Sequence, residues 1–244
     1  MGFDSGIRVS DFGLYRRSGF AFLPSPRTIP LHSSVRYAYP LMLDVSERLV
    51  VIIGGGAVAA RKARGLIKAG AKRIRVVSPV FDPGVPAAVA RVTETYEPRH
   101  LDGGGLVFAA TDRPEVNETV VRDARARGIL AARADADEGE SGDFSTPAHF
   151  REGQVIVSVS AGSAALTAAI RDGLAERFDP RWSVMADCMR TLRPLILKTL
   201  ADNPARRTKV LRALAGDEAM AAAEQGAGGV MAWLGERFPE FKHA

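Results

Sequence analysis

Hydrophobic runs and helical repeats alternate through the middle of the chain. Leu49–Ile53 is a run of five aliphatic residues, four of them β-branched, which predicts a strand buried on both faces. The alanine-rich stretch Ala57–Ala69 predicts a helix that ends at Gly70. Further strands are predicted at Arg73–Ser78, Thr93–Tyr96, Leu106–Ala110 and Ile129–Ala134, further helices at Asp82–Arg91 and Pro114–Arg127, and a loop at His100–Gly105. This alternation predicts a parallel, doubly wound α/β sheet.

The pattern changes after Ala134. Residues 135–143 carry five carboxylates and predict a polar loop. The next segments predict two strands outside the main sheet and a helix of small residues: Phe144–His149, Gln154–Ser160 and Ala164–Phe178. From Arg181 the chain is expected to be helical, with breaks at Asn203-Pro204, Gly216 and Gly226–Gly229. We therefore divide the chain into a mobile N-terminal tail (1–36), an α/β domain (37–147), a small α+β region (148–179) and a helical C-terminal domain (180–244).

A glycine-rich turn joins the first strand to its helix. Gly54, Gly56 and Ala59 fit the spacing G-x-G-x-x-A, the dinucleotide-binding fingerprint. Gly54 would allow the tight turn, Gly56 would let a pyrophosphate approach the backbone, and Ala59 would keep the helix close to the sheet. The helix would then offer unpaired N–H groups and its positive dipole end to the anion. The alternative is a glycine turn that serves packing alone.

Composition excludes several classes of protein. The 33 basic and 28 acidic residues give a net charge of +5, but no basic run is interleaved with aromatic residues, which argues against nucleic acid. A polyanionic small molecule would account for the surplus, as would a bias toward Arg and Ala in the coding sequence. Cys188 is the single cysteine, so a disulfide framework is excluded and a reducing cytoplasm fits. The four histidines are not spaced like the ligands of a metal site. The sequence contains no run of about 18 apolar residues, the length that a membrane-spanning helix needs.

Several motifs beyond the fingerprint resemble one enzyme family. They are Tyr39–Asp44, Gly54–Lys62 with the pattern G-G-G-x-V-A-x-R-K, Val76–Pro79, Ala109–Asp112 with Asn117-Glu118, Phe144–Ala148 and Val155–Ser160. Together they resemble precorrin-2 dehydrogenase, the amino-terminal module of siroheme synthase that also occurs as a stand-alone enzyme. The resemblance covers about residues 39–180. It implies a Rossmann-type NAD-binding domain, a dimerisation region at 148–179, and a homodimer that oxidises the tetrapyrrole precorrin-2 to sirohydrochlorin in siroheme biosynthesis.

The resemblance also suggests residue roles. It implies a catalytic aspartate at the end of the fifth strand, where Asp135 would accept the proton released on oxidation. The loop is about two residues longer than usual, so Asp137 is the alternative, and a solvated loop carboxylate without a role is another. The expected NAD-binding residues are Gly54, Gly55, Gly56, Ala57, Val58, Ser78, Thr111 and Asp112. Asp112 either lines the nicotinamide pocket or caps the next helix.

Two departures from the family pattern change the expectation. Ser78 stands where a carboxylate would select NAD over NADP, so the choice of NAD follows the family alone. Ser160–Ser163 is shorter than the family's S-x-G-G-x-S-P loop and lacks its proline. Some family members also insert ferrous iron, and this shortened loop argues against that activity and predicts a separate chelatase. Two other functions stay open: a nucleotide-sensing regulatory module like those that gate potassium channels, and a tetrapyrrole-binding family member without catalysis.

Overall fold

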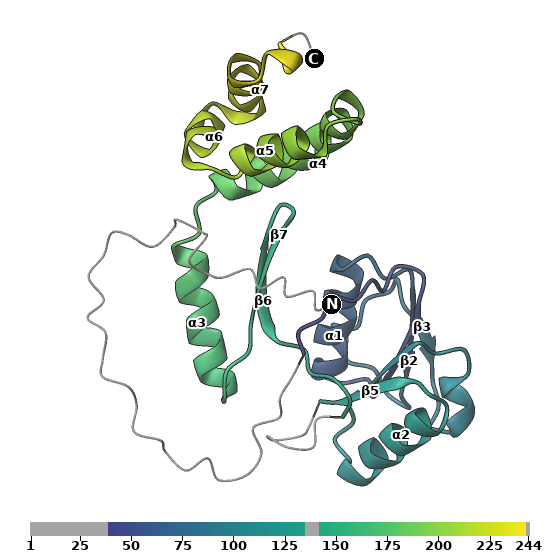
Figure 1. Cartoon of the computed structure of the whole chain (residues 1–244). Coiled ribbons are helices and arrows are strands. Elements are labelled where there is room, and N and C mark those ends of the chain that lie inside the picture. The colour runs from purple at the N-terminus through teal and green to yellow at the C-terminus, as the bar shows by residue number, and fades with distance from the viewer. Residues whose placement is uncertain (1–38, 135–141, 243–244) are drawn as a thin grey trace, which may run out of the picture. The chain divides into compact units, whose positions relative to one another are not determined.

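A five-stranded parallel sheet forms the first part of the chain (Figure 1). The computed structural model describes residues 39–134 and 142–242, so the predicted N-terminal tail lies outside the described residues. The strands are β1 (Leu49–Ile53), β2 (Arg73–Val77), β3 (Ala90–Val92), β4 (Leu106–Ala109) and β5 (Leu130–Arg133), in the order β3-β2-β1-β4-β5. β1 is central, with Ile53 in register with Val77 of β2 and with Ala109 of β4.

Both faces of β1 are covered, which explains its unbroken aliphatic sequence. Val50 and Ile52 pack in one core cluster with Ala59, Ala60 and Ala63 of helix α1 (Ala57–Lys68). Val51 and Ile53 pack in a second cluster that includes Val120, Val121 and Ala124 of helix α2 (Pro114–Ala126). Helices on opposite faces of a parallel sheet are the doubly wound arrangement. The predicted fold class is confirmed.

The predicted helix at Asp82–Arg91 is wrong. This stretch contains turns and the start of the edge strand β3, which ends at Val92, so the predicted strand at Thr93–Tyr96 is also wrong. Val85 and Val89 are buried at a helical spacing, which explains the mistaken prediction. Pro83 and Pro86 oppose a helix here because each lacks an N–H and restricts the residue before it. The first two residues of the predicted loop at His100–Gly105 belong instead to a 3-10 turn, η2 (Pro98–Leu101).

A hairpin and a helix follow the sheet. β6 (Ala148–Glu152) and β7 (Val155–Val159) pair antiparallel and form a separate sheet, as predicted. β6 begins after Pro147 rather than at Phe144, and the Phe144 ring instead packs against Phe108 of β4, with centroids 5.4 Å apart. Helix α3 (Ala164–Glu176) is capped by Ser163, whose side chain accepts a hydrogen bond from the Leu166 N–H.

The remaining chain is helical and has its own core. The helices are α4 (Arg181–Thr199), α5 (Pro204–Leu214), α6 (Asp217–Ala222) and α7 (Gly226–Arg237), with short 3-10 turns η3 (Ala223–Gln225) and η4 (Pro239–Phe241). The predicted break at Gly226–Gly229 is partly wrong, because α7 starts at Gly226 and includes Gly229. A Cβ on Gly229 would lie 2.3 Å from the Ala222 carbonyl oxygen, so close packing requires this glycine. Among the described residues no helix combines the length and apolar character that crossing a membrane requires.

Candidate dinucleotide site

The glycine turn lies where the connections of the sheet diverge. β1 pairs with β2 on one side and with β4 on the other, so the chain leaves β1 at a topological switch point. In open α/β sheets ligands bind outside the carboxyl ends of the strands at this point. Gly54, Gly55 and Gly56 follow the carboxyl end of β1 and lead directly into α1. The predicted glycine motif is therefore at the position in the fold that suits a dinucleotide.

The backbone packing of the fold requires glycine at the first two positions of the turn. Gly54 has a φ of +117°, and its N–H donates to the Val77 carbonyl oxygen at 2.8 Å. A Cβ on Gly54 would lie 2.2 Å from the Ala110 carbonyl oxygen, and one on Gly55 would lie 2.1 Å from that of Val80. Both distances are shorter than any non-bonded contact, so neither position accepts a side chain without a shift of the backbone.

Gly56 has a different environment. It is the N-cap of α1 with a φ of −80°, and a Cβ there would meet no atom of the described residues within 4 Å. The first turn of α1 contains no acidic side chain, and the N–H groups of Ala57, Val58 and Ala59 precede the first hydrogen bond of the helix, which the Ala60 N–H donates to the Gly56 carbonyl oxygen. Ala57 is exposed and Val58 is half-buried, whereas Ala59 is fully buried against the sheet. The space beside Gly56 is thus open at the positive end of a helix dipole, which is the arrangement that binds phosphate groups.

Ser78 follows β2 on one side of this turn. Its N–H donates to the Val92 carbonyl oxygen at 3.0 Å, and its buried hydroxyl donates to the Val80 carbonyl oxygen at 2.6 Å. The hydroxyl therefore shapes the loop after β2. That loop also contacts the glycine turn, because the Asp82 N–H donates to the Gly55 carbonyl oxygen at 2.8 Å.

Thr111 and Asp112 follow β4 on the other side. The Asn117 side chain holds this loop: its Oδ1 accepts from the Thr111 N–H at 3.1 Å and from the Thr111 hydroxyl at 2.7 Å, and its Nδ2 donates to the Thr111 carbonyl oxygen at 3.0 Å. Asn117 is fully buried in α2. Asp112 is exposed, and the N-cap of α2 is Arg113, so the alternative that Asp112 caps this helix is wrong.

The carboxyl end of β5 carries the predicted acidic loop. Asp135 and Asp137 lie outside the described residues, but both ends of their loop are described. The Ala134 N–H donates to the Ala109 carbonyl oxygen at 2.8 Å. On the return, Asp143 exchanges hydrogen bonds with Ala131: its N–H donates to the carbonyl oxygen at 2.7 Å and its carboxylate accepts from the N–H at 3.0 Å. The loop therefore starts and ends on β5.

Lys62 is a half-buried cation on the second turn of α1. Its Nζ donates to the Thr146 hydroxyl and lies 5.2 Å from the centroid of the Phe108 ring. Burial, with a smaller contribution from the adjacent Arg61 charge, lowers the pKa of Lys62 below its ordinary value. Lys62 thus joins α1 to the segment before β6. In the sequence this lysine belongs to the motif G-G-G-x-V-A-x-R-K, which by itself indicates no role for it.

Candidate metal ligands do not gather in the described part of the chain. No group of three His, Cys, Asp or Glu side chains there could hold a metal ion. The buried His100 bonds Glu94, with 3.0 Å between Nε2 and the carboxylate, and its Nδ1 accepts from the Glu97 N–H at 3.0 Å. Both ring nitrogens of His100 are therefore occupied by hydrogen bonds to residues just before η2.

Comparisons with known proteins show which domain family and which relatives the chain resembles. Residues 41–148 match the family described as putative NAD(P)-binding. The siroheme synthase of Photobacterium profundum is 35% identical over 175 residues, which are 69% of this chain and 37% of that protein. Siroheme synthase 1 of Aeromonas salmonicida is 40% identical over 131 residues, covering 52% of this chain and 27% of that protein. The chain thus spans about a third of the length of these curated relatives.

A solved structure supports the fold. The structure titled SirC, precorrin-2 dehydrogenase, covers 82% of this chain with a TM-score of 0.66, and all of that chain is matched. At 22% sequence identity this likeness shows the shared architecture alone. The matched domain and the sequence relatives confirm the resemblance that the motifs indicated, to precorrin-2 dehydrogenase, the amino-terminal module of siroheme synthase.

Proposed function

We propose that this protein oxidises precorrin-2 to sirohydrochlorin and uses NAD⁺ as the hydride acceptor. The observation that carries the proposal is the open space at Gly56, at the dipole end of α1 and at the switch point of the sheet. When bound, the nicotinamide would accept a hydride, and the second hydrogen of the substrate would leave as a proton. The products would be sirohydrochlorin, NADH and H⁺.

The glycine turn would hold the dinucleotide. Gly54 and Gly55 fix the turn, and the backbone N–H groups of Gly56, Ala57 and Val58 would bind the pyrophosphate. Ser78 would border the adenosine side, and Thr111 and Asp112 would border the nicotinamide side, since they follow the strands on either side of β1. The hydroxyl of Ser78 offers no negative charge to repel a 2′-phosphate, so the preference for NAD follows the family.

A carboxylate on the loop after β5 would accept the proton. Asp135 is our first candidate and Asp137 the second, because the loop is about two residues longer than the family's. The hydrogen bond from Ala134 to Ala109 supports this role, since it keeps the start of the loop at the carboxyl edge that borders the glycine turn. A base must lie within hydrogen-bonding reach of the proton that it abstracts.

A homodimer is also proposed. Leu166, Ile170 and Leu174 follow one another at intervals of four on α3 and are 52%, 38% and 44% exposed. Residues four apart lie on the same helix face, so the three form one apolar stripe. A two-fold contact between copies of the chain is the commonest way in which an oligomer would bury such a surface.

Dehydrogenation without iron insertion is the activity we favour. The shortened Ser160–Ser163 loop is tied to its own helix: the Ala161 N–H donates to the Thr167 hydroxyl, which donates in turn to the Ala161 carbonyl oxygen, both at 3.1 Å. A loop held in this way has little length with which to cover a macrocycle. A separate chelatase would then complete the conversion to siroheme.

The deciding experiment is incubation of the purified protein with precorrin-2 and NAD⁺ in the absence of metal. We expect the sirohydrochlorin spectrum and NADH to appear together, in equal amounts. Gly56→Asp is the matched control and should be inactive. NAD⁺ binding without turnover would favour the nucleotide-sensing alternative. Binding of the tetrapyrrole without NADH formation would favour a family member that has lost catalysis.

A further inference from the structure

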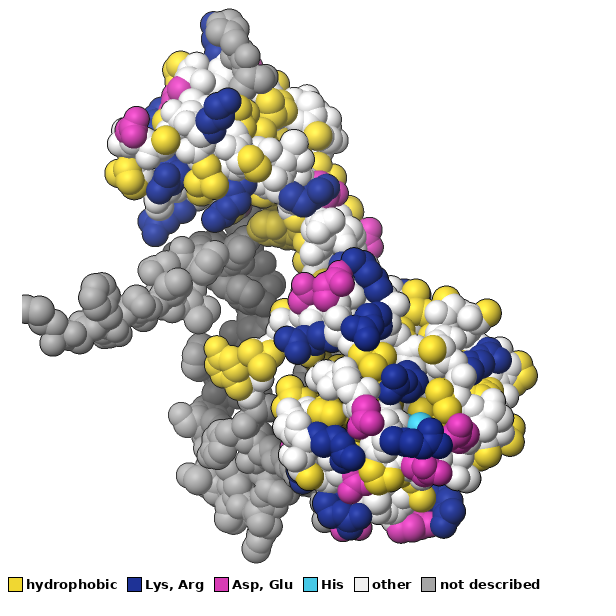
Figure 2. All heavy atoms as spheres, turned by 90° about the vertical axis from the view of Figure 1, so that its right-hand side faces the viewer, with side chains coloured by type: hydrophobic (Ala, Val, Ile, Leu, Met, Phe, Trp, Pro, Cys, Tyr) yellow, Lys and Arg dark blue, Asp and Glu magenta, His cyan; other side chains and the backbone are white. Residues whose placement is uncertain are grey.

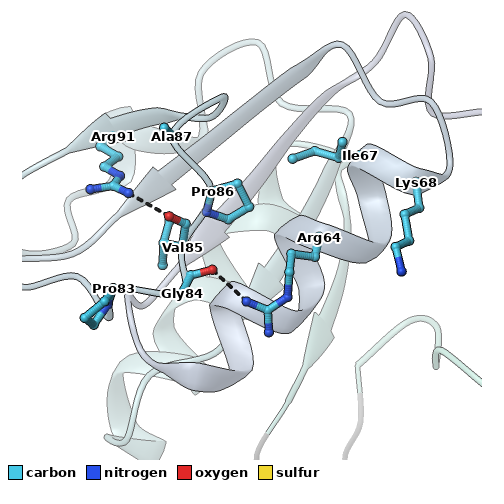
Figure 3. A pocket seen from close by; sticks show the side chains of 9 residues that line it. All are labelled: Arg64, Ile67, Lys68, Pro83, Gly84, Val85, Pro86, Ala87 and Arg91. Atoms are coloured by element: carbon cyan, nitrogen blue, oxygen red, sulfur yellow. Dashed lines mark hydrogen bonds between the residues drawn. The ribbon is translucent and has the colours of Figure 1, made fainter.

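We propose that the protein has a second anion-binding site, separate from the dinucleotide site, on the flank of α1. An open depression of about 550 Å³ lies between the last two turns of α1 and the loop at residues 83–87 (Figure 3). Its basic lining residues are Arg64 and Lys68 from α1 and Arg91 from β3. The ligand class we infer is a small molecule that carries two or more carboxylate or phosphate groups beside an apolar portion. We call this depression the α1 groove.

The charge of the α1 groove has one sign. Figure 2 shows basic and acidic side chains intermixed on one face of the molecule, whereas the residues that line this groove include three cations and no carboxylate. Asp82 lies nearby but is not among the lining residues, and its Oδ1 accepts from the Gly84 N–H at 2.6 Å. Three positive charges around one open depression attract anions, and the attraction weakens with salt.

Two of the cations are held in place by the protein. Nη1 of Arg64 donates to the Gly84 carbonyl oxygen, and Nη2 of Arg91 donates to that of Val85, each at 2.7 Å (Figure 3). Arg91 also lies over the Phe81 ring, 5.5 Å from its centroid. A guanidinium has five N–H donors, so each arginine keeps further donors for a carboxylate or phosphate. Fixing the side chain beforehand reduces the entropy that a ligand must overcome.

The distance along α1 separates this groove from the dinucleotide phosphates. Arg64 follows Gly56 by eight residues, and a rise of 1.5 Å per residue puts it about 12 Å further along the helix. The pyrophosphate at the first turn therefore does not reach the groove. The apolar lining, from Ile67, Pro83 and Pro86, is the reason that we infer a ligand with an apolar portion rather than a bare inorganic ion.

Calorimetric titration of the full chain with citrate at low salt tests the proposal. The background is Gly56→Asp, which closes the dinucleotide site to anions. We expect citrate to bind, and Lys68→Gln and Arg64→Gln each to lower the affinity about tenfold, the loss of one charge-assisted contact. Arg61→Gln, on the same helix but outside the groove, should bind as the parent does. Arg64 bonds the 83–87 loop, so Arg64→Gln could disturb the groove itself. Lys68→Gln then provides the test.

Three results would overturn the proposal. One is the absence of citrate binding at millimolar concentration in low salt. Another is an equal loss of affinity in Arg61→Gln, which would indicate general electrostatic attraction. The third is citrate binding to the wild type that is lost in the Gly56→Asp background and is unaffected by Arg64→Gln or Lys68→Gln, which would assign the anion to the dinucleotide site. None of these results depends on dehydrogenase activity, so the two proposals fail separately.

Discussion

Alanine substitutions at Gly54 and Gly56 should separate the requirements of the fold from those of the ligand. Gly54→Ala would force a residue with a side chain to a φ of +117° and bring its Cβ to 2.2 Å from the Ala110 carbonyl oxygen. Backbone strain and overpacking together cost about 2–6 kcal/mol. That is a large part of the roughly 5–15 kcal/mol by which domains are stable. We expect Gly54→Ala to be strongly destabilised or unfolded.

Gly56→Ala should leave the protein folded. The φ of −80° suits any residue, and a Cβ there meets no described atom within 4 Å. Loss of glycine at the N-cap costs about 1 kcal/mol at most. The added methyl group would stand where the pyrophosphate should approach. One or two charge-assisted hydrogen bonds of about 1.5 kcal/mol each would be lost, so the NAD⁺ affinity should fall about 10- to 150-fold.

Urea denaturation and calorimetric titration with NAD⁺ measure the two effects. Gly65→Ala is the matched control, because Gly65 lies on the same helix in open surroundings. It should bind NAD⁺ normally and gain about 0.5–1 kcal/mol of stability. Gly56→Asp adds a negative charge and should abolish binding while the fold survives. Unchanged NAD⁺ affinity in Gly56→Asp would refute the assignment of the site.

The remaining predictions concern catalysis, stability and assembly. Asp135→Ala should lower the dehydrogenase rate about 10²–10⁴-fold in a precorrin-2 assay, the usual loss for a general base; if Asp137→Ala is the impaired variant, our alignment of the loop is shifted by two residues. Asn117→Ala should lower the free energy of unfolding by about 1–3 kcal/mol, because the fully buried Asn117 side chain is the partner of the half-buried Thr111 N–H and carbonyl oxygen; a neutral effect in urea denaturation would contradict this. Burial lowers the pKa of Lys62, so the unfolded chain binds the Lys62 proton more tightly than the folded protein does. The free energy of unfolding of the wild type, relative to that of Lys62→Met, should therefore rise with pH as the pH approaches the ordinary lysine pKa from below. Urea denaturation in alkaline buffers that shows a fall instead would contradict this. Ile170→Asp should convert the proposed dimer to a monomer in sedimentation, and a wild-type monomer at micromolar concentration would exclude the dimer.

The elements that could be predicted are those whose patterns are local. β1 is a continuous aliphatic run because both of its faces are buried, and the turn after it is glycine because the chain approaches Ala110 there. The helix predicted at Asp82–Arg91 failed because the spacing of Val85 and Val89 imitates a helical repeat. Burial of both valines is achieved there by turns, since the prolines do not permit a helix.

The contacts that hold the candidate site together could not be predicted. Asn117 bonds to a threonine on the preceding loop, and Asp143 bonds to Arg125 and to the backbone of β5. The partners of Asp143 are 12 and 18 residues away and only the fold brings them near, whereas Asn117 bonds a residue six positions back, on the loop that leads into its own helix. In the sequence Asn117 was part of a matching motif without a role, and Asp143 was one of five carboxylates in a polar loop.

The surroundings of Gly54 and Gly56 place different requirements on the residue at each position. The conformation of Gly54 requires a glycine, but that of Gly56 does not, and the described surroundings leave room for a side chain. An N-cap prefers Ser, Thr, Asp or Asn, and a negative charge in the first turn would stabilise α1 through its dipole. The protein has none of these at the start of α1. A bound pyrophosphate would satisfy the same N–H groups and supply the missing charge, and it needs the backbone uncovered. The residue at position 56 is therefore better explained by a ligand than by the stability of the helix.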